Sequence, residues 1–203
     1  FLTYCEEIGL NRKKIKTADY ISLDYFENLP KELKDSDVMV LRMGGGQKTS
    51  FVLFTTGNNL RNFFLHDGEL FDDIFPKTFM PRVEMRELIP YYLMPTRSET
   101  TFVNFALSTG VFHKALGLDG DSKITMPATG RSNFTFDLKI HSLINKIFHH
   151  KSGQVEIDGI FLGQREGQDC IFVLEARNSK KLQSLSKHKL VYPILSIAQS
   201  VPT

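Results

Sequence analysis

The sequence predicts an α/β (α+β) chain, with a mixed β-sheet flanked by helices in residues 91–203 and a small α+β unit before it in residues 1–90. Two observations predict this class. Short runs that alternate polar and apolar residues, as strands do, occur between stretches in which apolar residues recur with helical spacing. The 203 residues are 41% hydrophobic and 24% charged, a composition typical of a globular protein that buries a core.

The first expected hairpin lies in residues 1–90. The apolar runs VMVLR (38–42) and SFVLFT (50–55) read as strands, and MGGGQKT joins them. A phosphate-binding loop needs a glycine directly before its lysine and a helix after it. Here Gln47 precedes Lys48 and a strand follows, so we expect a flexible turn that approaches DNA with Lys48.

The first helix of residues 91–203 is expected to begin after Ser98. Serine is a good N-cap, and apolar residues from Phe102 to Phe112 form a stripe that ends near Gly117. Glu99 is the one carboxylate in this helix. An acid in the first turn also stabilises a helix by interacting with its dipole, so Glu99 could have a purely structural role.

The central stretch of the chain is a predicted hairpin. Residues 154–162 alternate before turning apolar, and residues 170–174 (CIFVL) form a short apolar run. Between them, GQREGQD has the composition of a turn.

This hairpin brings two acids together. A period of two places Glu156, Asp158 and Ile160 on one face, and likewise Val173, Glu175 and Arg177. If the turn is symmetric, Asp158 lies opposite Glu175, with Cβ atoms about 5 Å apart. Mg²⁺ binds through one or two such carboxylates. The alternative is a pair of solvated acids, although Glu175 ends an apolar run, where a carboxylate costs folding energy.

The order of these residues resembles a known family. Asp158 in an EIDG strand, a hairpin, an apolar strand ending in Glu175-x-Arg177, and then Asn178 and LSKHKLVYPI are similar to the PD-(D/E)xK nuclease superfamily, which has the fold of type II restriction endonucleases. The resemblance implies Asp158 and Glu175 as metal ligands. It also implies a further acid, Glu156 or Glu99, as an outer ligand.

One residue departs from the family pattern. Arg177 stands where the family usually has its catalytic lysine. A guanidinium stabilises charge on a phosphate but cannot act as a base. Either Lys180, Lys187 or Lys189 supplies an ammonium from a neighbouring element, or the domain binds DNA and cuts poorly.

The net charge of +2 neither supports nor opposes nucleic-acid binding. The distribution of charge along the chain is more informative. No acid follows Glu175, whereas bases are frequent there. Basic residues bind the phosphate backbone of DNA. The alternative interpretation is that these residues form the solvated face of a helix. The residues expected to contact DNA are Lys180, Lys187, His188 and Lys189, together with Lys48.

Composition excludes several classes of protein. No apolar run reaches the roughly 18 residues of a membrane span, and the start does not resemble a signal peptide. We therefore expect a cytoplasmic protein that does not enter membranes. Its two cysteines, Cys5 and Cys170, are expected to be reduced and structural.

The expected function is Mg²⁺-dependent hydrolysis of double-stranded DNA by a type II restriction endonuclease. A palindromic target would imply a homodimer, and a restriction role would imply a cognate DNA methyltransferase. Two alternatives stay open. One is a DNA-binding module that keeps the fold without cutting, and the other is a protein-interaction domain whose acidic hairpin is ordinary surface.

Overall fold

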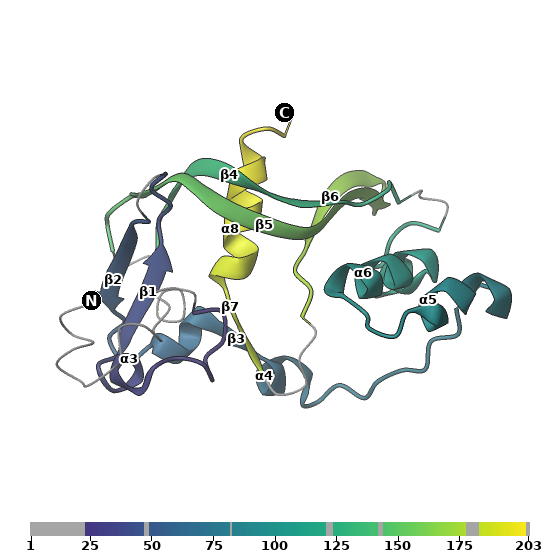
Figure 1. Ribbon diagram of the computed structural model, residues 1–203, viewed down its shortest axis with the longest axis horizontal. Coiled ribbons are helices and arrows are strands. Elements are labelled where there is room, and N and C mark those ends of the chain that lie inside the picture. The colour runs from purple at the N-terminus through teal and green to yellow at the C-terminus, as the bar shows by residue number, and fades with distance from the viewer. Residues whose placement is uncertain are drawn as a thin grey trace. The chain divides into compact units, whose positions relative to one another are not determined.

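The structure is a computed structural model in which several short stretches are left undescribed. It describes residues 23–46, 49–81, 83–120, 124–141, 144–177 and 183–201. The described residues form both short helices and short strands (Figure 1). The predicted α+β class is therefore confirmed at this level.

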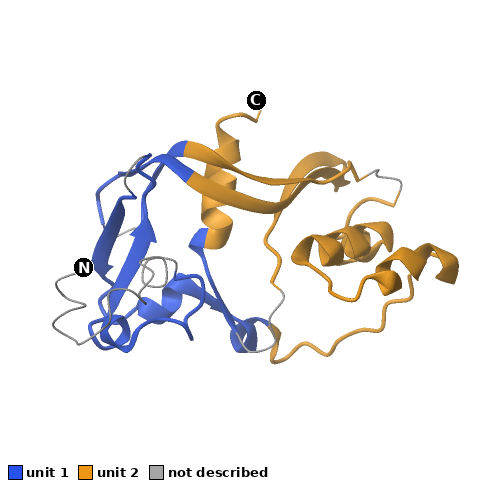
Figure 2. Cartoon of the chain, viewed as in Figure 1, with its two compact units in different colours: residues 1–70, 135–153, 182–188 blue, residues 71–134, 154–181, 189–203 orange. Residues whose placement is uncertain are grey.

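The chain forms two compact units, and each unit collects separate stretches of sequence (Figure 2). Unit 1 contains residues 1–70, 135–153 and 182–188. Unit 2 contains residues 71–134, 154–181 and 189–203. The sequence predicts instead a division near residue 90, and that division by function remains a prediction.

Unit 1 contains the expected first hairpin. Strand β1 (Val38–Arg42) pairs antiparallel with β2 (Phe51–Thr55), with Val40 opposite Leu53. The predicted strands are thus confirmed. The middle of β1 is buried, whereas β2 alternates between exposed and half-buried residues, so β1 contributes more to the core. The short helix α3 (Lys31–Asp35) precedes them.

Two glycines allow the end of β1 to touch a distant strand. Gly44 forms a parallel bridge with Lys151, and the amide of Gly45 donates to the Lys151 carbonyl at 2.6 Å. A Cβ on Gly44 would lie 2.3 Å from that carbonyl oxygen, and one on Gly153 would lie 2.5 Å from the Gly44 Cα. Glycine is required at both positions because the two backbones meet there.

A second small sheet in unit 1 joins residues far apart in the chain. Strand β3 (Phe64–His66) pairs antiparallel with β7 (Ser184–Ser186). The 3-10 helix η1 (Leu60–Phe63) leads into β3, and α4 (Asp67–Phe71) follows it. β7 lies directly before helix α8 (His188–Ala198) in the sequence. The two serines of β7 are fully buried. Serine is not a residue that predicts a buried strand from the sequence.

Unit 2 contains most of the helices. The 3-10 helix η2 (Met85–Leu88) runs into α5 (Ile89–Leu93), and α6 (Glu99–Ser108) and α7 (Val111–Ala115) follow. The side chain of Ser98 accepts from the Thr101 amide, which confirms the predicted N-cap. The single helix expected up to Gly117 is interrupted at Gly110, whose φ of 78° is left-handed and ends the helix.

Three consecutive strands form the largest sheet. They lie in the order β4 (Ala128–Leu138), β5 (Phe148–Arg165) and β6 (Gln168–Leu174). β5 and β6 are antiparallel, from Gly159 opposite Leu174 to Arg165 opposite Gln168. β1–β2, β3–β7 and β5–β6 all pair antiparallel, so the predicted mixed sheet is not what these strands form.

The turn of the β5–β6 hairpin contains two residues. Glu166 and Gly167 both have positive φ, at 56° and 74°. This is the type I′ geometry that matches the twist of paired strands. Asp119 holds the turn, because its carboxylate accepts from both amides at 3.0 and 2.9 Å.

One face of β5 is apolar and covered by helices. Residues at odd positions from Val155 to Gly163 are buried. Phe112 of α7 stacks on Phe161, with ring centroids 6.1 Å apart, and Gly159 lies against Val103 of α6. The even-numbered positions, which include Asp158, therefore form the opposite face.

The last helix, α8 (His188–Ala198), contains a proline. Tyr192, Pro193 and Ser196 are its buried residues. The hydroxyl of Ser196 donates to the Pro193 carbonyl at 2.8 Å. None of the helices in the described ranges has both the length and the apolar character needed to cross a bilayer.

Candidate functional site

The β5–β6 ladder ends next to Asp158 and Glu175. Its last pair is Gly159 with Leu174, and each acid lies one residue beyond that pair. Directly opposite residues of an antiparallel pair lie on the same face, with Cβ atoms about 4.5–5.5 Å apart. The expected pairing of Asp158 with Glu175 would extend this register by one step, and it remains a prediction. The metal-binding role of the two acids is a separate prediction.

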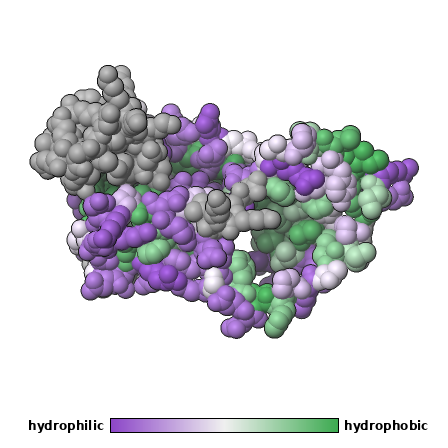
Figure 3. Space-filling view, turned by 60° about the horizontal axis from the view of Figure 1, so that its bottom comes forward, coloured by the Kyte–Doolittle hydropathy of each residue, from purple (hydrophilic) through white to green (hydrophobic). Residues whose placement is uncertain are grey.

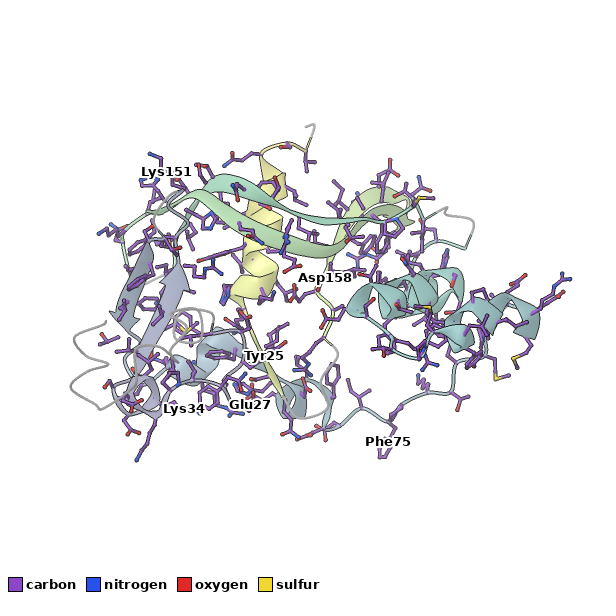
Figure 4. The ribbon with its side chains drawn as sticks, viewed as in Figure 1. Tyr25, Glu27, Lys34, Phe75, Lys151 and Asp158 are labelled. Atoms are coloured by element: carbon purple, nitrogen blue, oxygen red, sulfur yellow. The ribbon has the colours of Figure 1, made fainter. Side chains whose placement is uncertain are left out.

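Asp158 is anchored by the backbone of the facing segment. Its Oδ2 atom accepts a hydrogen bond from the Ala176 amide at 2.7 Å, and the residue is half-buried. Figure 4 labels Asp158 on its strand. The bond joins the two segments just past the last ladder pair, so the hairpin remains closed where the acids lie. The other carboxylate oxygen is not committed to this bond.

Glu175 is a buried acid with a lysine partner. Its side chain is only 6% exposed, and its Oε1 atom lies 3.0 Å from Nζ of Lys189, whose side chain is 24% exposed. A buried carboxylate is strongly unfavourable unless it is paired. Glu175 is therefore not a solvated surface acid, as the alternative interpretation of this hairpin would require.

Lys189 comes from the first turn of α8. The sequence offers Lys180, Lys187 and Lys189 as sources of an ammonium. The structure brings Lys189 to Glu175. Lys187 is exposed, and its backbone amide donates to the Phe63 carbonyl in unit 1, while Lys180 lies outside the described residues.

The remaining acids are less central. Glu156 is exposed on β5, two residues before Asp158 and on the same face, and Glu99 is the half-buried first residue of α6. Within the described ranges, no three His, Cys, Asp or Glu side chains lie close enough together to hold a metal ion. The outer-ligand role of Glu99 and Glu156 remains a prediction.

Arg177 lies in the loop after β6, two residues beyond Glu175, and is half-buried. His188, the first residue of α8, belongs to unit 1 and is engaged there. Its Nδ1 atom lies 2.5 Å from Oγ of Ser186, and its Nε2 atom lies 3.5 Å from Oδ1 of Asp24. These contacts commit both ring nitrogens, so its expected contact with DNA gains no support. Lys48 lies outside the described residues.

Sequence reasoning missed two features of unit 2. The amide of Ala176 has no signature in a side-chain pattern, because its hydrogen bond to Asp158 depends on how the loop leaves β6. The second feature is a cavity of about 580 Å³ where α6 meets α7, which does not include the two acids. Its lining contains Phe79, Met80, Leu107, Ser108, Thr109, Gly110, His113, Lys114, Gly117, Leu118 and Gly120.

The two acids and the lysine suit the binding of a hard cation. Mg²⁺ takes one or two carboxylates and keeps several waters, and Asp158 and Glu175 provide two next to the end of the β5–β6 ladder. The ammonium of Lys189 is a compact donor able to orient a water molecule. It also neutralises one of the two negative charges, which weakens the attraction for a cation.

Comparison with known families assigns the chain. It belongs to the family described as Domain of unknown function (DUF6997), whose model matches residues 67–202. The match covers about two thirds of the chain and contains Asp158, Glu175 and Lys189. No curated protein and no solved structure matches the chain.

Proposed function

We propose that this protein is a Mg²⁺-dependent endonuclease that hydrolyses DNA phosphodiester bonds, of the type II restriction endonuclease class. The observation that carries the proposal is the constellation at the end of the β5–β6 hairpin. Asp158 and Glu175 each lie one residue beyond the last ladder pair, and Lys189 lies 3.0 Å from Glu175. A buried acid paired with a lysine beside a second acid is unusual on an ordinary hairpin surface.

Each residue has a distinct role in this proposal. Asp158 and Glu175 hold the cation, which would polarise the phosphodiester and lower the pKa of a bound water. Lys189 takes the position that Arg177 leaves open and orients the attacking water. Arg177 stabilises the negative charge that develops on the phosphate. Double-stranded DNA is the proposed partner, with a DNA methyltransferase as the companion enzyme.

The test is plasmid cleavage. With Mg²⁺ or Mn²⁺ the wild-type chain should nick or linearise plasmid DNA, and EDTA should stop it. Asp158→Asn keeps the shape of the side chain, removes its charge and should lower the rate at least about 100-fold. Asp169→Asn is the matched control, because Asp169 is an exposed acid of the same hairpin whose carboxylate accepts from Gln164. Equal rates for the two variants would refute the assignment.

One observation favours a second candidate function. The ammonium of Lys189 already neutralises Glu175, so the site could remain metal-free in a DNA-binding module that does not cut. In that case DNA would bind at low salt, with affinity that falls as salt rises. Binding would be equal for wild type and Asp158→Asn. Mn²⁺ would neither induce nicking nor raise the melting temperature, whereas the nuclease should show both effects.

A further inference from the structure

A stretch of unit 2 exposes an unusual number of large apolar side chains. We name residues 71–94, leaving out the undescribed Arg82, the apolar segment. It contains ten of the twenty-one exposed large hydrophobic residues in the described part of the chain, in about a seventh of the described residues. Phe75 is 90% exposed and Met80 79%, and Figure 4 shows Phe75 pointing away from the ribbon.

The apolar segment is anchored at its end. Tyr91 of α5 packs on Phe105 of α6, with ring centroids 4.3 Å apart, and the guanidinium of Arg97 lies 4.4 Å from the Tyr91 ring. On the same short helix, Tyr92 and Leu93 remain exposed. One side of α5 thus packs against α6, and its other side is exposed. Figure 3 shows hydrophobic atoms gathered at the right of the view, where Figure 1 places α5 and α6.

The exposed area fits one side of a dimer interface. An aromatic side chain offers roughly 150–250 Å², so ten large apolar side chains of which 37–90% is exposed present on the order of 1,000 Å². A standard interface needs about 800 Å² and about 20–30 residues from each partner. The exposed apolar area of the segment is thus about what one partner of such an interface contributes. Monomeric proteins rarely expose this much apolar surface in one stretch.

Charge favours a second copy of the chain over DNA or a membrane surface. With Arg82 counted, residues 71–94 have four acids and three bases by sequence, so the stretch is nearly neutral. A DNA backbone or an anionic membrane surface would require an excess of basic residues. Two copies of a nearly neutral apolar surface meet with little repulsion, and a two-fold axis makes one surface complementary to itself.

We propose that the apolar segment is the surface through which two copies of this chain form a dimer in solution. The proposal does not depend on nuclease activity, because oligomeric state is measured without DNA or metal. It therefore stands or falls separately from the assignment of Asp158 and Glu175.

Sedimentation of the wild-type chain between about 1 and 100 µM should show a dimer. The double variant Phe75→Ser with Met80→Ser should raise the dissociation constant at least tenfold. Met126→Ser is the matched control, because Met126 is 91% exposed but lies outside the apolar segment, and it should leave dimerisation unchanged. Because all three side chains are exposed, none of these changes disturbs the core.

Hydrogen exchange of the wild-type chain provides a test that needs no variant. Backbone amides of residues 74–84 should gain protection as the concentration rises from about 1 to 100 µM. The proposal is overturned by a monomer throughout this range, which would leave the surface to a different protein. It is equally overturned by a dimer that the double variant and the control affect alike.

Discussion

At the residue scale, the feature that governs the candidate site is the charge balance of Glu175. The Glu175 side chain is only 6% exposed, and Lys189, 3.0 Å away, lowers the cost of burying a charged carboxylate there. Asp158 has the backbone amide of Ala176 as a partner. The two acids are therefore held by different means.

Removing the lysine should cost more than removing the pair. Lys189→Met leaves Glu175 buried without its lysine partner, and since the lysine is partly exposed we expect a loss of about 1–3 kcal/mol in the free energy of unfolding. Adding Glu175→Gln to it should recover about 1 kcal/mol or more. Urea denaturation of the two single variants and the double variant measures the coupling. Additive effects would show that the two side chains do not interact.

At the element scale, a close glycine contact in unit 1 joins the segment just after β1 to β5. Gly44 and Gly153 approach so closely that either Cβ would meet backbone atoms within 3 Å. His150, which is fully buried, stacks on Phe136 with ring centroids 4.3 Å apart, beside the same contact. Adding a single methyl group at Gly153 would therefore displace both the backbone at Gly44 and the ring of His150.

Gly153→Ala should destabilise the protein by about 1–3 kcal/mol, the usual cost of overpacking. The new Cβ would lie 2.5 Å from the Gly44 Cα and from the His150 ring. Gly120→Ala is the control, because nothing lies within 4 Å of a Cβ there. Thermal unfolding of both variants tests the contact. A melting temperature for Gly153→Ala that equals the control's would mean that the two backbones separate without cost.

At the scale of the whole molecule, two acids of unit 1 link stability to pH. Burial raises the pKa of Glu27, but hydrogen bonds from Ser184 and from backbone amides outweigh it, and the net pKa is lowered. The hydrogen bond from Thr56 is the main reason that the pKa of Asp37 is lowered, helped by amides that include Asn58. Both acids bind protons less readily in the folded state than in the unfolded chain.

Stability should therefore fall in acid. The contribution of these acids is fully present above their unfolded pKa values, about 4, and is lost as pH falls through the lower folded values. Melting temperatures measured from pH 6 to pH 2.5 should decline below about pH 4. The double variant Glu27→Gln with Asp37→Asn should be less stable at pH 6 and should decline less steeply. A decline of unchanged steepness would assign the acid sensitivity to other groups.

The sequence by itself determined the local features of this protein. The alternation in residues 154–162, the apolar run in residues 170–174 and the turn between them define the hairpin, whose last ladder pair, Gly159 with Leu174, lies next to Asp158 and Glu175. Ser98 defines the start of α6. These features depend on neighbouring residues, so periodicity and turn chemistry reveal them.

Only the tertiary structure decided which distant segments meet. The pairing of β3 with β7 joins Phe64 to Ser186, and the choice of Lys189 over other lysines depends on where α8 begins. Each unit is likewise assembled from stretches that are separate in the sequence. Such contacts join segments that are remote in sequence, and the burial that selects them depends on the packing of the whole chain, which no local pattern records.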